Sequence, residues 1–293
     1  MRLPDCFFAV ADEEGRSQIR KCIEARGHTS SYRIGRSIEG RAIEMYKIGK
    51  GRGRVALFGA HHALEGITSN ILYAIIYILS YGLGPNFVGL DIALLHSLAS
   101  FYIVPSVNPD GVELHHRGMG SGFLRGRQAA MSGGDFSHWQ ANARGVDLNH
   151  NYDYGFAEYK QLEKERGIAP GATLYSGEYP ESEPETRAVA AFVRALGPDA
   201  VISLHTQGEE IYHSKDGKGI AMAGLVSRYT GYTCSTPTDT AAYGGLCDYT
   251  ASLGIPSLTV EIGRGKNPLP QSAIIPALQR ITEPLLLLPS LLV

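Results

Sequence analysis

The sequence lacks a long apolar run, and this absence limits where the protein can act. It begins MRLPDCFFAVADEEGRSQIRK, so acidic residues follow only a short apolar stretch. A secretory signal peptide needs a longer apolar segment, and we therefore expect no signal peptide and a cytoplasmic protein, released at most by cell lysis. The apolar stretch 71–79 is well short of the roughly 20 residues of a membrane span. We predict a buried helix there and no membrane span.

An excess of charge of one sign is missing as well. The 293 residues include 27 basic and 29 acidic side chains, for a formal net charge of -2. This balance gives no reason to expect nucleic acid or an anionic membrane as a partner. The four cysteines contain no C-x-x-C pair, which excludes a zinc ribbon and a dense disulfide framework. We expect free thiols in a reducing compartment; the oligomeric state stays open.

What the sequence does contain is an alternation of β-rich and helical runs, which is typical of the α/β class. We predict strands at 43–48, 55–59, 101–105, 200–204, 210–212 and 257–262, and helices at 12–26, 66–81, 182–196, 219–229, 245–254 and 271–288. No linker or repeat divides the chain, so we expect one catalytic domain over 1–293, with a helical lead-in at 1–30 and no large prodomain. Residues 108–180 show little periodicity, which predicts a long functional loop region.

Two histidines and a glutamate lie at predicted strand ends. His62 and Glu65 fall where the strand RVALF passes into a helix, and His205 ends the apolar run DAVISLH. Ligands bind at the carboxyl edge of an open α/β sheet. Two imidazoles and one carboxylate leave a fourth position for water, which is the arrangement of a catalytic zinc site. We therefore predict one Zn²⁺ ion held by His62, Glu65 and His205.

Other interpretations of these residues exist. His62 could be a hydrogen-bonded histidine, and Glu65 a first-turn carboxylate favoured by the helix dipole. His61 could replace His62 as a ligand, although successive side chains usually diverge. Further histidines that sequence alone cannot place are His115, His116, His138 and His213.

Five motifs in order resemble those of the zinc carboxypeptidase family. They are GAHHALEGITSN, PSVNPDGV, GVDLNHN, SLH and TVEIG, and the similarity extends over nearly the whole chain. The resemblance implies a mixed, mostly parallel eight-stranded twisted sheet flanked by helices. It also implies that Glu261 is the catalytic base, which takes a proton from water and passes one to the departing amine. The alternative for Glu261 is a strand-end carboxylate paired with Arg264.

Departures from the family pattern bear on the substrate. At the turn where the family clamps a terminal carboxylate with Asn-Arg, this chain has Asn149 and His150. Histidine cannot form the bidentate fork of a guanidinium, so trimming of ordinary peptide C-termini becomes less favourable. Where the family has an oxyanion-stabilising arginine, this chain has Gln140, and Arg144 is a second candidate donor.

Three further positions concern the specificity pocket. The family's tyrosine near the Gly-Gly turn corresponds to Thr240, and Tyr243 is either a substitute donor or a packed loop residue. Asp248, Glu209 and Glu210 are acidic candidates for binding a substrate ammonium group, with solvated surface charge as the alternative.

The Asn-His turn, PESEPETRA and EIGRGKNPLP resemble a bacterial branch that cleaves γ-D-glutamyl–meso-diaminopimelate bonds in peptidoglycan stem peptides. The resemblance implies a metallopeptidase acting on a peptide or muropeptide. The alternatives are a conventional metallocarboxypeptidase, a small-substrate amidohydrolase, and an inactive protein that binds cell-wall fragments.

Overall fold

A single mixed sheet forms the centre of the protein in the computed structural model, which describes residues 3–9, 11–25, 29–81, 90–118, 124–235 and 243–292. Its eight strands lie in the order β1-β2-β4-β3-β5-β8-β6-β7. The bounds are β1 (Ser30–Arg36), β2 (Ala42–Ile48), β3 (Gly53–Phe58), β4 (Ala99–Val104), β5 (Ala200–His205), β6 (Glu210–His213), β7 (Thr233–Ser235) and β8 (Ser257–Glu261). This confirms the predicted fold class.

The centre of the sheet is parallel. Strands β4, β3, β5 and β8 pair in parallel, whereas β1, β2 and β6 join their neighbours β2, β4 and β8 in antiparallel fashion. The central strands β3 and β5 are almost entirely buried apolar runs, as expected for strands covered on both faces. Because parallel strands end at the same edge, the residues that follow β3, β5 and β8 are brought together there.

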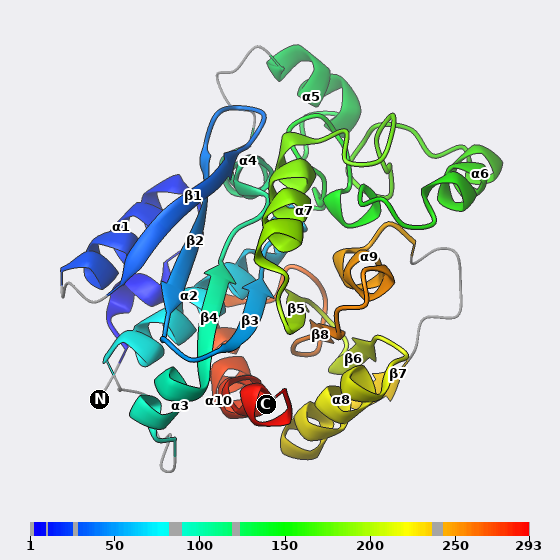
Figure 1. Ribbon diagram of the computed structural model, residues 1–293. Coiled ribbons are helices and arrows are strands. Elements are labelled where there is room, and N and C mark those ends of the chain that lie inside the picture. The colour runs from blue at the N-terminus through cyan, green and yellow to red at the C-terminus, as the bar shows by residue number, and fades with distance from the viewer. Residues whose placement is uncertain are drawn as a thin grey trace.

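Helices cover both faces of this sheet (Figure 1). One buried cluster joins the sheet to α1 (Glu13–Glu24), α2 (Gly66–Tyr81), α8 (Gly217–Thr230) and α10 (Ile274–Leu287). A second cluster joins it to α7 (Pro184–Leu196) and α9 (Leu246–Ser252). The remaining helices are α3 (Ile92–Leu98), α4 (Pro109–Arg117), α5 (Arg125–Ser132) and α6 (Phe156–Arg166).

Helix α2 is the core helix that the apolar stretch predicted. From 66 to 79 every residue in it is buried, including three polar side chains, Thr68, Ser69 and Asn70. By length and composition, Ala63–Tyr81 would be long and apolar enough to cross a membrane, but 94% of its most apolar stretch is buried inside the protein. This helix is therefore buried in the protein interior, as a core helix is.

The region 108–180 differs from the sequence-based expectation of a long irregular loop. It contains α4, α5 and α6, although no strand occurs in its described residues. Helix α4 starts at Pro109 after an Asn108 side-chain cap, and α6 is mostly polar, so neither has the long apolar periodicity that reveals a helix. Strand β1 was also missed, because at the sheet edge its residues are largely exposed.

Candidate metal centre

Three side chains converge at the carboxyl edge of the parallel strands. The Nδ1 atom of His62 lies 3.0 Å from Oε1 of Glu65, and Nδ1 of His205 lies 3.1 Å from Oε2 of the same carboxylate. The two Nδ1 atoms are 3.3 Å apart. Among the described residues this is the group of histidine, cysteine and acidic side chains able to hold a metal ion, with ligand atoms all within 4.8 Å of one another.

Local structure explains how residues far apart in the chain meet here. His205 is the last residue of β5, and the segment after β3 carries His62 and then Glu65 in a 3₁₀ turn, Ala63–Glu65, that leads into α2. The backbone N–H of Ala63 donates to the carbonyl of Gln140, which ties this turn to the loop before Asp147. The metal-binding turn is therefore held on two sides.

The outer nitrogens of both histidines are engaged. Nε2 of His62 lies 3.2 Å from Oδ1 of Asp147, a fully buried carboxylate, and Nε2 of His205 lies 3.1 Å from the hydroxyl of Ser203. A proton held on Nε2 by such a partner leaves the Nδ1 lone pair directed inward, and outer partners of this kind orient metal ligands. Asp147 is not among the site residues predicted from the sequence, although it lies in the GVDLNHN motif.

His61 lies beneath the centre and does not join it. Its ring stacks on that of His205 with centroids 5.5 Å apart, and Nε2 lies 3.0 Å from the hydroxyl of Tyr152. Burial and the neighbouring histidines hold the pKa of His61 well below its usual range. A neutral, buried His61 supports the position of His205. His62, and not His61, belongs to the metal-binding group.

The donor set fits a divalent cation. Oε2 of Glu65 is buried, and although Nδ1 of His205 lies 3.1 Å away, it forms no hydrogen bond of good geometry, a costly state for a carboxylate oxygen unless a positive charge faces it. Burial alone would raise the pKa of Glu65, but His62 and His205 outweigh it and lower that pKa to about 2. Burial likewise opposes charge on His62, yet Glu65 and Asp147 raise the pKa of its imidazole well above the usual range. The site therefore favours positive charge, and nitrogen and oxygen donors suit zinc.

Glu261 lies beside this centre. It ends β8 and is the register partner of His205 on β5, and its neighbour Ile262 donates its backbone N–H to the His205 carbonyl. Burial and the Glu65 carboxylate raise the pKa of Glu261 to about 8, while His62 lowers it. Arg264, the alternative partner considered for Glu261, instead lies 2.9 Å from Glu209. The charges that act on Glu261 thus include those of the metal-binding residues Glu65 and His62, while Arg264 is engaged elsewhere.

The Asn149–His150 turn contacts the Gly-Gly turn. Nδ1 of His150 lies 2.8 Å from the carbonyl of Tyr243, and its ring stacks on Tyr159 with centroids 4.3 Å apart. The side-chain oxygen of Asn149 accepts the backbone N–H of Leu246. Since a carbonyl can only accept, Nδ1 of His150 carries a proton and donates to it.

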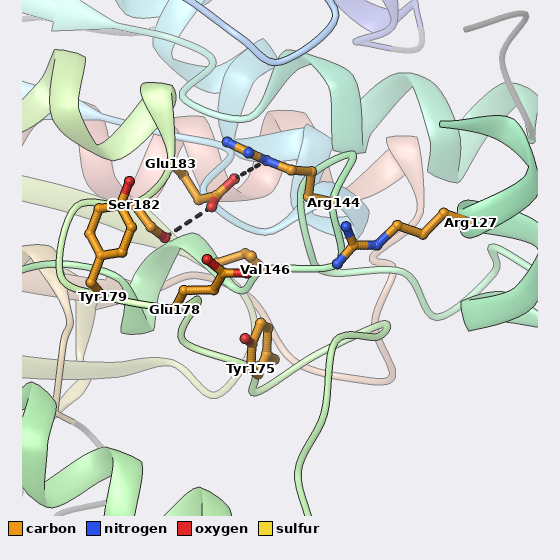
Figure 2. A pocket seen from close by; sticks show the side chains of 8 residues that line it. All are labelled: Arg127, Arg144, Val146, Tyr175, Glu178, Tyr179, Ser182 and Glu183. Atoms are coloured by element: carbon orange, nitrogen blue, oxygen red, sulfur yellow. Dashed lines mark hydrogen bonds and ion pairs between the residues drawn. The ribbon is translucent and has the colours of Figure 1, made fainter. Parts of the chain in front are cut away.

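The two candidate oxyanion donors lie in different places. The Gln140 side-chain oxygen accepts the Thr173 hydroxyl at 2.7 Å, beside the metal-binding turn that its own carbonyl holds. Arg144 instead pairs with Glu183 at 3.0 Å in a separate pocket of about 90 Å³, into which Arg127 also points (Figure 2). That pocket is lined by neither the metal-binding residues nor Glu261, so the structure does not bring Arg144 to the metal centre, and its part in stabilising the oxyanion stays a prediction.

Two of the remaining predicted positions concern the tyrosine near the Gly-Gly turn. The Tyr243 ring packs against Gly155 and against Tyr154, which fits a packed loop residue, and Thr240 lies outside the described residues.

Glu209 is occupied by ion pairs with Arg264 and Arg280, so it is not a free acceptor. Glu210 accepts the Tyr212 hydroxyl and is the register partner of Glu261. Burial raises the pKa of Asp248 to about 6, with Lys215 opposing it.

Removing the charge of Asp147 is expected to weaken zinc binding. In Asp147→Asn the side chain keeps its size, but the charged partner of His62 Nε2 is lost, and we expect zinc affinity to fall by about 10–100-fold. Competition with a chromophoric chelator measures this. Asp135→Asn, on an exposed loop, is the matched control and should bind zinc as the parent does. Equal affinity of all three proteins would rule out the orienting role.

Comparison with known proteins agrees with this geometry. The family model described as "Zinc carboxypeptidase" matches residues 21–240. A Bacillus subtilis protein, YqgT, is 32% identical over 272 residues, which span 88% of this chain and 71% of that protein. Gamma-D-glutamyl-L-diamino acid endopeptidase 1 of Lysinibacillus sphaericus is also 32% identical, over 82% of this chain and 62% of that protein.

A solved structure extends the likeness to three dimensions. Bovine thrombin-activatable fibrinolysis inhibitor, in complex with tick carboxypeptidase inhibitor, superposes with a TM-score of 0.75 at 25% identity and covers 97% of both chains. The family model alone covers more than half of the present chain. The protein therefore belongs to the zinc carboxypeptidase family, whose members are zinc-dependent peptidases.

Proposed function

We propose that this protein hydrolyses an amide bond in peptidoglycan stem peptides, between γ-D-glutamate and meso-diaminopimelate. The observation that carries the proposal is the convergence of His62, Glu65 and His205 beside Glu261. The endopeptidase relative, whose name specifies a γ-D-glutamyl-diamino acid bond, supports the choice of bond.

In this proposal the zinc ion is held by His62, Glu65 and His205. Bound zinc supplies Lewis-acid activation of the scissile carbonyl and of water. Glu261 accepts a proton from the attacking water and delivers it to the departing amine, a task for which a pKa near neutrality is suitable. The Gln140 amide, oriented by Thr173, is the neutral donor toward the developing oxyanion.

The substrate preference rests on the turn that faces the departing group. Because Nδ1 of His150 donates to the Tyr243 carbonyl, an imidazole there cannot form the two-pronged contact with a carboxylate that a guanidinium forms. Asp248 is ionised above a pKa of about 6 and so carries a negative charge at neutral pH. The missing carboxylate fork and the anion at Asp248 together favour a group bearing an ammonium, such as a diamino acid, over a simple terminal carboxylate.

The discriminating experiment compares two substrates on one zinc-loaded preparation. We expect release of diaminopimelate from a muramyl tripeptide and much slower hydrolysis of a hippuryl peptide. Preferential hydrolysis of the hippuryl peptide would identify a conventional metallocarboxypeptidase. Bound zinc with turnover of neither substrate would indicate a protein that only binds cell-wall fragments.

Replacing His150 by arginine tests the turn directly. A guanidinium at this position can form the carboxylate fork that the chain lacks, so His150→Arg is expected to gain hippuryl-peptide hydrolysis, chiefly through a lower KM. His150→Gln, which removes the imidazole without adding the fork, is the matched control and should show no gain. Unchanged activity of His150→Arg on both substrates would refute this role of the turn.

A further inference from the structure

Two cysteines meet at the N-terminal side of the core. Cys6 lies in the 3₁₀ turn Asp5–Phe8, Cys22 lies in α1, and their Sγ atoms are 3.0 Å apart. The S–S bond of a disulfide is about 1 Å shorter than this separation. Cys234 and Cys247, the other two cysteines, are free thiols elsewhere in the fold.

The two sulfur atoms are held in place by well-packed elements. Phe7 is fully buried and its ring lies 5.1 Å from that of Tyr77 on α2, centroid to centroid. The Asn70 amide donates to the carbonyls of Phe7 and Ala9 at 3.0 and 2.8 Å. On the other side, Ile19 and Ile23 fix α1 in the core. The contact between the thiols therefore follows from the packing of both elements on α2.

We propose that Cys6 and Cys22 are a site of oxidative modification, at which a small-molecule disulfide converts the two thiols into an intramolecular disulfide. One cysteine thiolate attacks the reagent RSSR and releases RS⁻; the second thiolate then attacks the mixed disulfide and releases the other RS⁻. The cysteines lose two electrons, RSSR is reduced to two RSH, and the two thiol protons pass to the released thiolates. The bond joins the segment 3–9 covalently to α1.

Partial exposure makes the pair accessible to a reagent, and the raised pKa of Cys6 makes the reaction depend on pH. Both thiols are partly exposed, so a small reagent can reach them. Burial and the neighbouring Cys22 raise the pKa of Cys6 to about 12, which slows attack by this thiol near neutral pH, so we expect oxidation to accelerate as the pH rises and the thiolate fraction grows. The joined segment lies on α2, whose first turn directly follows Glu65, so the modification would fasten the N-terminal segment onto the helix that begins at the metal centre.

The test uses the full-length protein equilibrated with oxidised glutathione and, in parallel, with dithiothreitol. We expect the oxidised sample to lose two of its four titratable thiols, to yield a peptide linking Cys6 to Cys22, and to unfold several degrees higher than the reduced sample. Each of Cys6→Ser and Cys22→Ser should abolish both the linkage and the temperature difference. Cys234→Ser, at an exposed position, should retain both.

Three results would overturn the proposal. One is the recovery of four free thiols after equilibration with the oxidant. Another is a stable glutathione adduct on Cys6 or Cys22 without a linked peptide. The third is a linkage involving Cys234 or Cys247 in place of the proposed pair.

Discussion

Glu261→Gln is expected to lower kcat on a muramyl tripeptide by about 10²–10⁴-fold, the range contributed by a positioned general base. Glutamine has nearly the same shape but cannot accept a proton from water. Glu261 is outside the metal-binding group, so the variant should still bind one zinc ion per chain. Steady-state kinetics and metal analysis of the same preparation measure both quantities.

One control variant makes this result specific. Glu210→Gln removes the negative charge from the register partner of Glu261 on the neighbouring strand; this lowers the pKa of Glu261 but keeps the proposed base in place, so the variant should retain most of the activity. Full activity of zinc-loaded Glu261→Gln would mean that another group transfers the proton. Loss of zinc from Glu261→Gln would mean instead that this carboxylate is a ligand.

His205→Ala is the second change with a large expected effect. The substitution removes one of two imidazole ligands and leaves Glu65 and His62 without their partner across the site. Loss of a residue that only orients a metal ligand lowers metal affinity by up to roughly 100-fold. Because His205 is itself a ligand, we expect a larger fall in zinc affinity, and hydrolysis should be lost in proportion. Because zinc stabilises only the folded state, the variant should also lose the rise in melting temperature that added zinc gives the parent.

Dissociation constants and zinc-dependent melting curves measure these effects. His213→Ala, at the end of β6 and outside the metal-binding group, is the matched control and should keep parental affinity. Parental zinc affinity in His205→Ala would exclude this histidine as a ligand.

The sequence predicted best those elements whose burial is uniform. The bounds of α2 match the predicted helix, because its continuous apolar run can only be covered by the core. His62 and His205 could be placed because both follow apolar strands, and parallel strands end at one edge. In contrast, α6 has few apolar residues and β1 lies exposed at the sheet edge, so their patterns carried little information.

Interactions between distant segments were harder to predict. The role of Asp147 depends on meeting the outer nitrogen of His62, and no local pattern records that contact. Arg144 follows Trp139 and Gln140 closely in sequence, yet its side chain turns to Glu183 in the pocket of Figure 2. The sequence shows that Arg144 is charged. The loop between Asn142 and Asp147 determines where its side chain points.

A crystal structure of the zinc-loaded protein, with anomalous data on both sides of the zinc edge, tests the central claim most directly. We predict one zinc peak, about 2.0–2.2 Å from Nδ1 of His62, Nδ1 of His205 and a carboxylate oxygen of Glu65. Glu261 should face the open coordination position without binding the ion. A peak coordinated by His61, by Glu261 or by residues elsewhere in the fold would contradict the proposed centre.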